Sequence, residues 1–220
     1  MWLNLEAYLE KINSDSEKYY EFSEFVIKLT HDMMPLDLNK LFNNDNKIFK
    51  FEIGFGNGDS IIELARRNPH INYFGFDRKM DRVRTALSKI NRNALPNLLV
   101  ARCGTDYLLD MFPHDFFEEI IMNFPDPWPK KKHNKKRTVN GEFVKVIHRL
   151  LKNDGVFRFS SDHVDYSFNV YHILSNSGLF DNSYFPEHYK TEIKDRVMTQ
   201  FEKHKTRDGL TIHHMKFRKK

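Results

Sequence analysis

One stretch of the sequence restricts the fold more than any other. Residues 48–53 (Ile-Phe-Lys-Phe-Glu-Ile) have the composition of a β-strand, and three glycines spaced two apart follow at 54, 56 and 58. A helix is predicted directly behind them, over 59–67, and a second strand over 71–76. Glycines let a backbone turn sharply and approach a ligand closely. The pattern therefore predicts an α/β fold with a ligand at the carboxyl ends of its strands.

The alternation of strands and helices continues along the chain. Residues 5–12 and 22–29 have apolar side chains at helical spacing, so two short helices are predicted there, with Ser14-Asp15-Ser16 between them as a cap for the second. Further helices are expected over 78–93, 140–151 and 163–177, and further strands over 97–101, 116–122, 156–161 and 211–217, with a turn at 153–155.

An acid after the second strand indicates a nucleoside cofactor. Asp77 lies about 20 residues after the glycine loop, where a carboxylate accepts hydrogen bonds from ribose hydroxyls. A dinucleotide fingerprint would need a third glycine at position 59, which is Asp59 here and would repel a pyrophosphate. The spacing, with Glu52 two residues ahead, instead resembles motif I of class I S-adenosylmethionine-dependent methyltransferases, whose cationic cofactor tolerates carboxylates. A nicotinamide cofactor remains the alternative.

A second unusual stretch follows the strand predicted at 116–122. Prolines at 125, 127 and 129 exclude helix and sheet pairing, so Asp126 and Trp128 are expected on a stiff loop. Residues 130–137 then carry six Lys or Arg and no acid; with a net charge of +5 overall, the rest of the chain sums to +5 − 6 = −1. Positive charge concentrated in this way favours a surface for nucleic acid, with a solvated loop or a localisation signal as the alternatives.

Other sequence features bear on disulfides, metal sites and the cellular compartment. The single cysteine, Cys103, excludes an internal disulfide and a Cys-based metal site, and the eleven histidines lack the paired spacing of a zinc hydrolase. No signal peptide and no membrane-spanning run are evident. We expect a cytoplasmic protein without a metal or a membrane partner, and both a monomer and a homodimer remain open.

The proline-rich loop also carries a narrow resemblance. Residues 124–133 (Phe-Pro-Asp-Pro-Trp-Pro-Lys-Lys-Lys-His) and 135–137 closely resemble the signature of the bacterial tRNA (guanine-N7-)-methyltransferases. Phe159-Ser160-Ser161-Asp162 and Thr199-Gln200-Phe201-Glu202 are similar to two further motifs of that family, so the likeness spans roughly residues 48 to 218.

This resemblance implies a class I methyltransferase (Rossmann-like) fold, with a mostly parallel seven-stranded sheet, helices on both faces and an antiparallel last strand. It implies a methyltransferase domain over 48–220, with the N-terminal helical segment 1–47 packed on it. The implied activity is transfer of a methyl group from S-adenosylmethionine to N7 of a guanosine in the variable loop of tRNA, which forms 7-methylguanosine. A non-catalytic RNA-binding protein on the same scaffold is the rival reading.

By the same resemblance, residues can be assigned to the cofactor and to the RNA. The expected cofactor residues are Glu52, Gly54, Gly56, Gly58, Asp77, Gly104, Thr105, Asp106 and Asn123. The expected substrate residues are Asp126, Lys130, Asp162, Thr199, Gln200, Phe201 and Glu202, with 196–207 as a loop over the site. The RNA backbone would meet Lys131, Lys132, His133, Lys135, Lys136 and Arg137.

The chain departs from the family pattern in three places. Asp77 stands where a Glu is usual, and Gly104 where an Asp is usual, so the contact with adenine could shift to Thr105 or Asp106. The usual basic, Pro-containing opening is absent from the N-terminal region. Gly104–Asp106 could equally be an ordinary turn, since Gly and Asp suit one.

The chemistry at N7 explains why Asp126 is the expected catalytic residue. N7 is a lone pair with no proton to remove, so no general base is needed, and alignment with the methyl group supplies much of the rate. Methylation leaves positive charge on the base, which a fixed carboxylate stabilises in the transition state. Trp128 could stack on a base or support the loop. Asp162 could contact the substrate or cap the helix after it.

Overall fold

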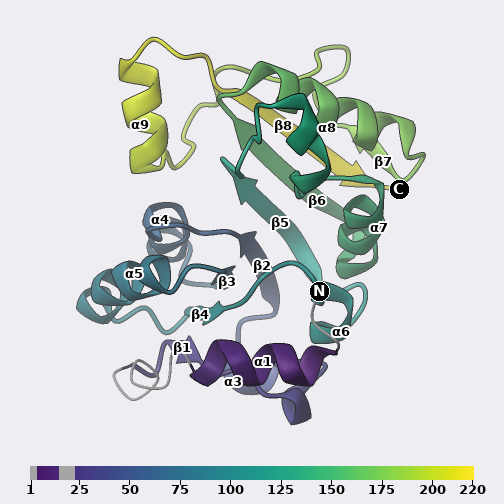
Figure 1. Cartoon of the computed structure of the whole chain (residues 1–220). Helices are drawn as coiled ribbons and strands as arrows, with labels where there is room; N and C mark the ends of the chain where they lie inside the picture. The colour runs from purple at the N-terminus through teal and green to yellow at the C-terminus, as the bar shows by residue number, and fades with distance from the viewer. Residues whose placement is uncertain (1–3, 15–22) are drawn as a thin grey trace. The chain divides into compact units, whose positions relative to one another are not determined.

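The computed structural model of the chain describes residues 4–14 and 23–220, and its chain divides into two compact units at Pro113/His114. From the sequence, residues 1–47 were expected as a helical segment packed on the domain 48–220, within a single domain overall, and that division remains a prediction. The first unit contains α1 (Leu5–Ser14), β1 (Val26–Ile27), η1 (His31–Met33), α3 (Leu38–Leu41), β2 (Ile48–Ile53), α4 (Asp59–Arg67), β3 (Ile71–Asp77), α5 (Met80–Asn93), β4 (Leu98–Arg102) and α6 (Leu108–Met111) (Figure 1).

The first unit is a parallel sheet covered by helices. Its strands lie in the order β1–β4–β3–β2, and each neighbouring pair is parallel. The helices α4 and α5 pack on β3 and β4 and on each other. One apolar face of α5 is buried, and its residues are Val83, Ala86, Leu87 and Ile90. Burial of that face holds the βαβ units together, since each CH₂ removed from water contributes about 0.8 kcal/mol.

A glycine in β3 allows α4 to approach the sheet closely. A Cβ built on Gly75 would lie 2.6 Å from Cδ1 of Ile61 and 2.9 Å from Cδ1 of Phe55. Both side chains are buried, so neither can move aside freely. The absence of a side chain at 75 therefore sets the distance between α4 and the strand that ends at Asp77.

The N-terminal segment differs from its prediction. The helix expected over 5–12 is confirmed as α1, but part of the helix expected over 22–29 is the strand β1. Val26 and Ile27 pair with Val100 and Ala101 of β4, because an exposed strand edge offers main-chain hydrogen bonds that helical spacing does not reveal. The proposed cap at 15 and 16 lies outside the described residues.

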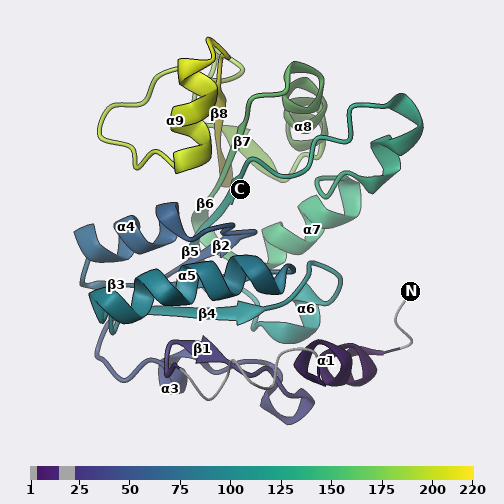
Figure 2. The same cartoon turned by 60° about the vertical axis from the view of Figure 1, so that its left-hand side comes forward.

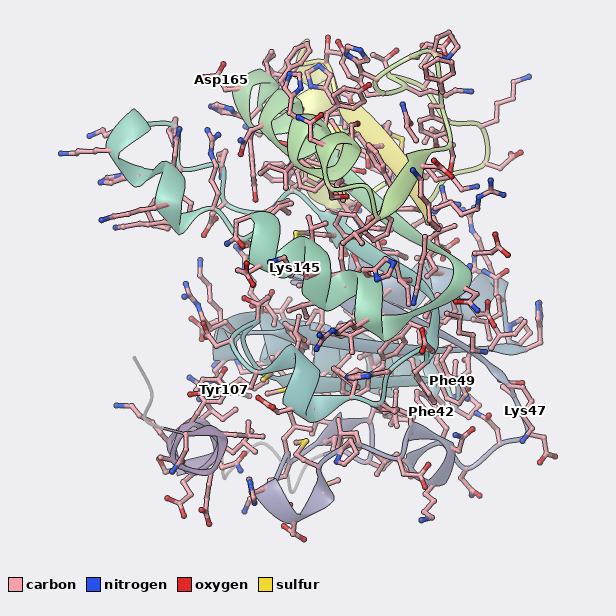
Figure 3. All side chains as sticks on the ribbon, turned by 90° about the vertical axis from the view of Figure 1, so that its right-hand side faces the viewer. Phe42, Lys47, Phe49, Tyr107, Lys145 and Asp165 are labelled. Carbon is pink, nitrogen blue, oxygen red and sulfur yellow. The ribbon has the colours of Figure 1, made fainter. Side chains whose placement is uncertain are left out.

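The same segment also packs against the start of β2. Phe42, at the end of α3, meets Phe49 edge-on with ring centroids 5.9 Å apart (Figure 3). Edge-to-face contact is a favoured arrangement of two aromatic rings. Residues 4–14 and 23–47 therefore belong to the body of the first unit.

The second unit combines parallel and antiparallel pairs. It contains β5 (Phe117–Asn123), η2 (Lys131–Lys136), α7 (Gly141–Leu150), β6 (Leu151–Ser161), α8 (Val164–Asn176), β7 (Phe180–Asn182), α9 (Gln200–Arg207) and β8 (His213–Lys219). The strands lie in the order β5–β6–β8–β7, with β5 parallel to β6 and β8 antiparallel to both of its neighbours. The antiparallel last strand is thus confirmed.

The number of strands corrects the expectation of seven. The described residues form eight, and the two short strands β1 and β7 have no counterpart among the strands placed from the sequence. The turn predicted at 153–155 is also wrong, because these residues lie inside β6. They form an irregularity of that strand, with a register shift against β5 and a φ of 61° at Asp154. Turn-forming residues therefore make a bulge here.

The two C-terminal helices lie on opposite sides of β8 (Figure 2). Tyr171 of α8 contacts Phe217 on one face of the strand. His214, whose side chain points to the other face because strand residues alternate, lies next to Glu202 of α9. This arrangement places α9 beside the ends of β6 and β8.

Candidate active site

The turn between β2 and α4 has the backbone that its glycines predict. Gly54, Gly56 and Gly58 have φ of 72°, 58° and 80°, in the left-handed region that favours glycine. Gly58 is the N-cap of α4. A Cβ built on Gly54 or Gly56 meets no atom within 4 Å, so the space beside them is open. The loop presents bare backbone to that space.

The carboxylate of Asp77 fixes this loop in place. Its Oδ2 accepts a hydrogen bond from the amide of Gly56 at 3.0 Å, and its Oδ1 accepts one from the amide of Lys79 at 2.8 Å. Burial raises the pKa of Asp77, and these amide donors oppose that shift. Glu52 is buried near the end of β2, in register with Gly75 of β3. The two predicted acids thus lie on adjacent strands, near the glycine loop.

Two cations on α5 also contact this region, and the sequence analysis did not identify them. Nζ of Lys89 lies 2.5 Å from Oδ1 of Asp59 and 2.9 Å from the carbonyl oxygen of Asn57. A guanidinium nitrogen of Arg82 donates to Oδ1 of Asn57 at 2.7 Å. Lys89 neutralises Asp59, so repulsion of a pyrophosphate by that carboxylate is weaker than the sequence alone indicates. A cavity of about 340 Å³ is lined by Asp59, Ile62, Glu63, Lys89 and Arg92.

The turn after β4 is completed by a residue from the N-terminal helix. The amide of Gly104 donates to the hydroxyl oxygen of Tyr8, in α1, at 2.5 Å. Thr105 is half-buried and Asp106 is exposed. The sequence analysis gave residues 1–47 only a packing role, and it had no pattern by which to find Tyr8.

The proline-rich loop follows β5 and has a strongly bent backbone. Phe124 and Trp128 have φ of 51° and 44°, and the amide of Phe124 donates to the carbonyl of Ser160 at 2.8 Å. Asn123 ends β5, and Asp126 projects its carboxylate at an exposed position. The expected stiff loop after the strand is confirmed by this geometry.

Arg137 differs from its expected role. It is buried, its Nε donates to the carbonyl of Pro127 at 2.9 Å, and its guanidinium stacks over the ring of Tyr166. It therefore fixes the loop from within rather than reaching toward an RNA backbone. The sequence counts it as one more charge in a run and cannot distinguish a buried arginine from an exposed one.

The rest of the basic run is a surface. Lys130, Lys132, Lys135 and Lys136 are exposed and His133 is half-buried; the side chain of Lys131 lies outside the described ones. The ring of Trp128 meets His133 edge-on, and Nζ of Lys136 lies over it at 4.8 Å. Trp128 thus packs against the basic segment, as expected if it supports the loop.

The segment expected to be a loop over 196–207 is largely helical. Thr199 caps α9 by accepting a hydrogen bond from the amide of Glu202 at 3.0 Å. Gln200 and Phe201 are exposed on the first turn. A Thr followed three residues later by Glu is a capping-box pattern, so the motif had a structural reading that the sequence analysis missed.

Asp162 does not cap α8, which was the alternative given for it. His163 is the N-cap, and its Nδ1 accepts from the amide of Tyr166 at 3.3 Å. Oδ2 of Asp162 instead lies 3.4 Å from Nζ of Lys205, on α9. The ring of Phe201 lies between Phe124, at a centroid distance of 5.0 Å, and Lys205, whose Nζ is 5.1 Å away.

Glu202 belongs to a buried polar cluster. Its carboxylate forms an ion pair with Arg196, and its Oε1 lies 3.5 Å from Nε2 of His214. Nδ1 of the same imidazole lies 2.9 Å from the hydroxyl oxygen of Ser160. The Nε2–H tautomer fits both contacts, with the serine hydroxyl donating to Nδ1. The expected substrate residue Glu202 therefore already has protein partners.

This cluster predicts an acid-sensitive stability. Burial and the nearby Arg196 lower the pKa of His214 to about 3. The unfolded chain then takes up a proton below about pH 6.5 that the folded chain rejects, so stability falls as the pH drops through that window. Between pH 6.5 and pH 5 this should cost about 2 kcal/mol, from about 1.4 kcal/mol per pH unit.

Urea unfolding at several pH values measures the effect. His214→Asn should remove about 2 kcal/mol of the loss between pH 6.5 and pH 5. An equal pH dependence in the wild type and His214→Asn would contradict the assignment.

Across residues 4–14 and 23–220, no group of three or more His, Cys, Asp or Glu is arranged to hold a metal ion. Within the same residues, no helix is long and apolar enough to cross a membrane.

The chain is similar to known proteins over most of its length. Residues 46–215 match the model of a family described as “Putative methyltransferase”. The chain is 32% identical over 183 residues to a tRNA (guanine-N(7)-)-methyltransferase from Leptospira interrogans, covering 82% of each chain. It is 31% identical over 214 residues to the protein of that name from Ureaplasma urealyticum (94% and 95% covered), and 36% identical over 169 residues to that from Francisella philomiragia (76% and 72% covered).

Solved structures support the fold. The 16S rRNA methyltransferase KamB has a TM-score of 0.59 at 15% identity, with 82% of this chain and 92% of that chain covered. A SAM-dependent methyltransferase from Aquifex aeolicus has a TM-score of 0.53 at 14% identity, with 96% and 97% covered. At such low identities these likenesses establish the methyltransferase fold alone.

Proposed function

Because the chain belongs to the family of tRNA (guanine-N7-)-methyltransferases, we propose that it methylates N7 of a guanosine in the variable loop of tRNA, with S-adenosylmethionine as methyl donor. The observation that carries the proposal is the proline-rich loop after β5, which pairs an exposed carboxylate with an exposed basic segment. A cytoplasmic location, and a monomer or homodimer, belong to the same proposal.

The first unit has residues that suit S-adenosylmethionine. The space beside Gly54 and Gly56 is open, so the cofactor can approach the backbone closely. The Asp77 carboxylate at the adjacent strand end can accept hydrogen bonds from ribose hydroxyls. Glu52, Gly58, Gly104, Thr105 and Asp106 complete the proposed set within this unit. When bound, the cofactor supplies an electrophilic methyl group on a sulfonium.

The second unit supplies the groups for the nucleotide. N7 of guanine would bond to the methyl group through its lone pair while the methyl–sulfur bond breaks and its electron pair stays on sulfur, which leaves as a neutral thioether. No proton is removed, so the protein needs no base and contributes orientation and charge stabilisation. The Asp126 carboxylate is the proposed group that stabilises the cationic base. Its loop is held by the contacts of Arg137 with Pro127 and Tyr166, so the carboxylate is pre-positioned. Lys130, Asp162, Thr199, Gln200, Phe201 and Glu202 are the other proposed substrate residues.

One experiment tests the proposal directly. The pure protein is incubated with methyl-labelled S-adenosylmethionine and unmodified tRNA, and the RNA is digested and its nucleosides identified. We expect label in 7-methylguanosine, located in the variable loop by mapping of fragments. Label in another nucleoside would overturn the proposal, and no label at all would favour the non-catalytic scaffold. Tight binding of NAD with none of S-adenosylmethionine would favour the nicotinamide alternative.

The basic segment should make tRNA binding strongly dependent on salt. Lys132, Lys135 and Lys136 are exposed on η2 and carry three charges. Each phosphate contact contributes about 0.7–0.9 to the slope of log K against log salt, so replacing all three with Gln should reduce that slope by about 2–3. Filter binding between 50 and 200 mM salt measures this slope. In that range a protein with 6–10 phosphate contacts loses affinity by about 10³-fold or more.

A single lysine elsewhere serves as the control for that series. Lys145 on α7 is exposed and paired with Glu142, so Lys145→Gln should leave the slope unchanged. An unchanged slope in the triple variant would mean that RNA is held elsewhere.

A further inference from the structure

The N-terminal helix reaches the end of the strand that borders the proposed cofactor site. Asp77 of β3 and Arg102 of β4 are register partners, so residues 103–106 follow directly beside the acid proposed for the ribose. In open α/β sheets the ligand lies outside the carboxyl ends of such adjacent strands. The turn after β4 therefore borders the part of the site next to the ribose, where the adenine of the proposed cofactor would be held.

Tyr8 of α1 holds this turn through a buried chain of hydrogen bonds. The Gly104 amide donates to the Tyr8 hydroxyl oxygen at 2.5 Å, and that hydroxyl bonds to Cys103, whose thiol donates to the sulfur of Met111 at 3.5 Å. The Tyr8 side chain is 4% exposed. Burial raises the pKa of the Tyr8 phenol and raises that of the Cys103 thiol to about 12. Neither group ionises near neutral pH, so these hydrogen bonds are kept.

Other contacts fix the position of Tyr8 itself. Its ring lies 5.3 Å from that of Tyr107, the residue that precedes α6 (labelled in Figure 3). A guanidinium nitrogen of Arg102 donates to the carbonyl of Ile12 at 2.8 Å, and the amide nitrogen of the Asn13 side chain donates to the carbonyl of Leu29 at 2.7 Å. The helix is thus attached to β4 at the very turn that Tyr8 contacts.

The space around Gly104 makes this arrangement specific to the pair. A Cβ built on Gly104 would lie 3.0 Å from the Tyr8 hydroxyl oxygen, and its next neighbour would be Oδ2 of Asp106 at 3.4 Å. The phenol oxygen therefore occupies the place that a side chain at 104 would need. Gly104 and Tyr8 therefore depend on each other. The carboxylate of Asp106, an exposed residue, lies beside this pair.

From these contacts we infer that Tyr8 is a positioning residue for the cofactor. It holds the Gly104–Asp106 turn in the form that receives the adenine end, so the N-terminal helix is part of the cofactor site. This inference rests on the proposed use of S-adenosylmethionine. Tyr8 acts on the cofactor through the main chain of Gly104.

A double-mutant cycle on the full chain tests it, with binding of S-adenosylhomocysteine and of adenosine measured by calorimetry. Tyr8→Phe keeps the ring and removes the hydroxyl, so we expect affinity for both ligands to fall about tenfold, the typical worth of one hydrogen bond. Gly104→Ala should lower affinity by a similar factor, because the new methyl group meets the phenol oxygen. In the double variant the loss should stay about tenfold rather than reach about a hundredfold, since removing the oxygen leaves room for the methyl group.

Two readouts separate this role from a general structural one. For methylation, Tyr8→Phe should raise KM for S-adenosylmethionine while KM for tRNA and kcat stay unchanged. Tyr73→Phe, which removes another buried phenol of the first unit, should leave affinity for S-adenosylhomocysteine unchanged. Tyr8→Phe with wild-type affinity, or additive losses in the double variant, would overturn the inference while leaving the proposed function intact. A wild-type protein that does not bind S-adenosylhomocysteine would overturn both.

Discussion

Replacing Asp126 with alanine is expected to lower kcat by about 10²–10³, the cost of removing one preorganised electrostatic group from a transition state. The base gains positive charge only as the methyl group is transferred, so the carboxylate stabilises the transition state more than the bound substrate. Binding of tRNA should change less than about twofold, because the phosphate backbone supplies most of the affinity. Single-turnover methylation and filter binding measure the two quantities separately.

Two companion variants make this prediction specific to charge. Asp126→Asn keeps the shape of the side chain and should be nearly as inactive as Asp126→Ala. Asp165→Ala removes an exposed carboxylate near the start of α8, labelled in Figure 3, and should be fully active. If Asp126→Asn kept most of the wild-type rate, orientation of the base by hydrogen bonds would replace charge stabilisation as the role of this residue.

Replacing Arg196 with methionine should destabilise the protein by about 3–5 kcal/mol, because it leaves a buried carboxylate without its cationic partner. Glu202 is 3% exposed, and its other titratable neighbour, His214, is neutral at pH 7 because its pKa is lowered. An uncompensated carboxylate would either remain charged at high cost or take up a proton. Urea unfolding at pH 7 gives the free energy of unfolding, and the loss should shrink at lower pH as the carboxyl is protonated.

A double variant supplies the control. In Arg196→Met with Glu202→Gln, both charges are absent, and replacing a buried ion pair as a whole is often nearly neutral for stability. We therefore expect the double variant to recover most of the loss. If Arg196→Met were as stable as the wild type, Glu202 would have no structural need for this partner, and its proposed part in substrate binding would gain weight.

Local patterns in the sequence determined the backbone of the glycine loop and the strands beside it in the first unit. Three glycines two apart permit a left-handed backbone, which all three adopt, and an acid at the next strand's end lies beside them once the strands are parallel. The predicted strand at 48–53 and helix at 59–67 have the observed bounds. These features depend on neighbours in the chain, so the chain order is enough to place them.

The proline-rich loop was determined in the same way, but its support was not. Prolines at 125, 127 and 129 restrict their own backbone and that of the residues before them, wherever the loop lies. Arg137 is buried, unlike the exposed lysines of the basic run, and it donates a hydrogen bond to Pro127. This position depends on Tyr166, which lies 29 positions further along the chain and packs against the guanidinium. Burial of one charge among six equal ones has no signature in a sequence.

Only the tertiary structure decided which polar residues have protein partners. It brought Tyr8 to Gly104 across 96 positions of sequence, Lys205 to Asp162, and Arg196 and His214 to Glu202. It also made β1 a strand, because an available edge of β4 outweighed helical spacing. Composition and spacing report the conformations a segment prefers and the chemistry it can perform. Which side chain fills the space beside another is set by packing between distant segments, and that information exists only once the chain has folded.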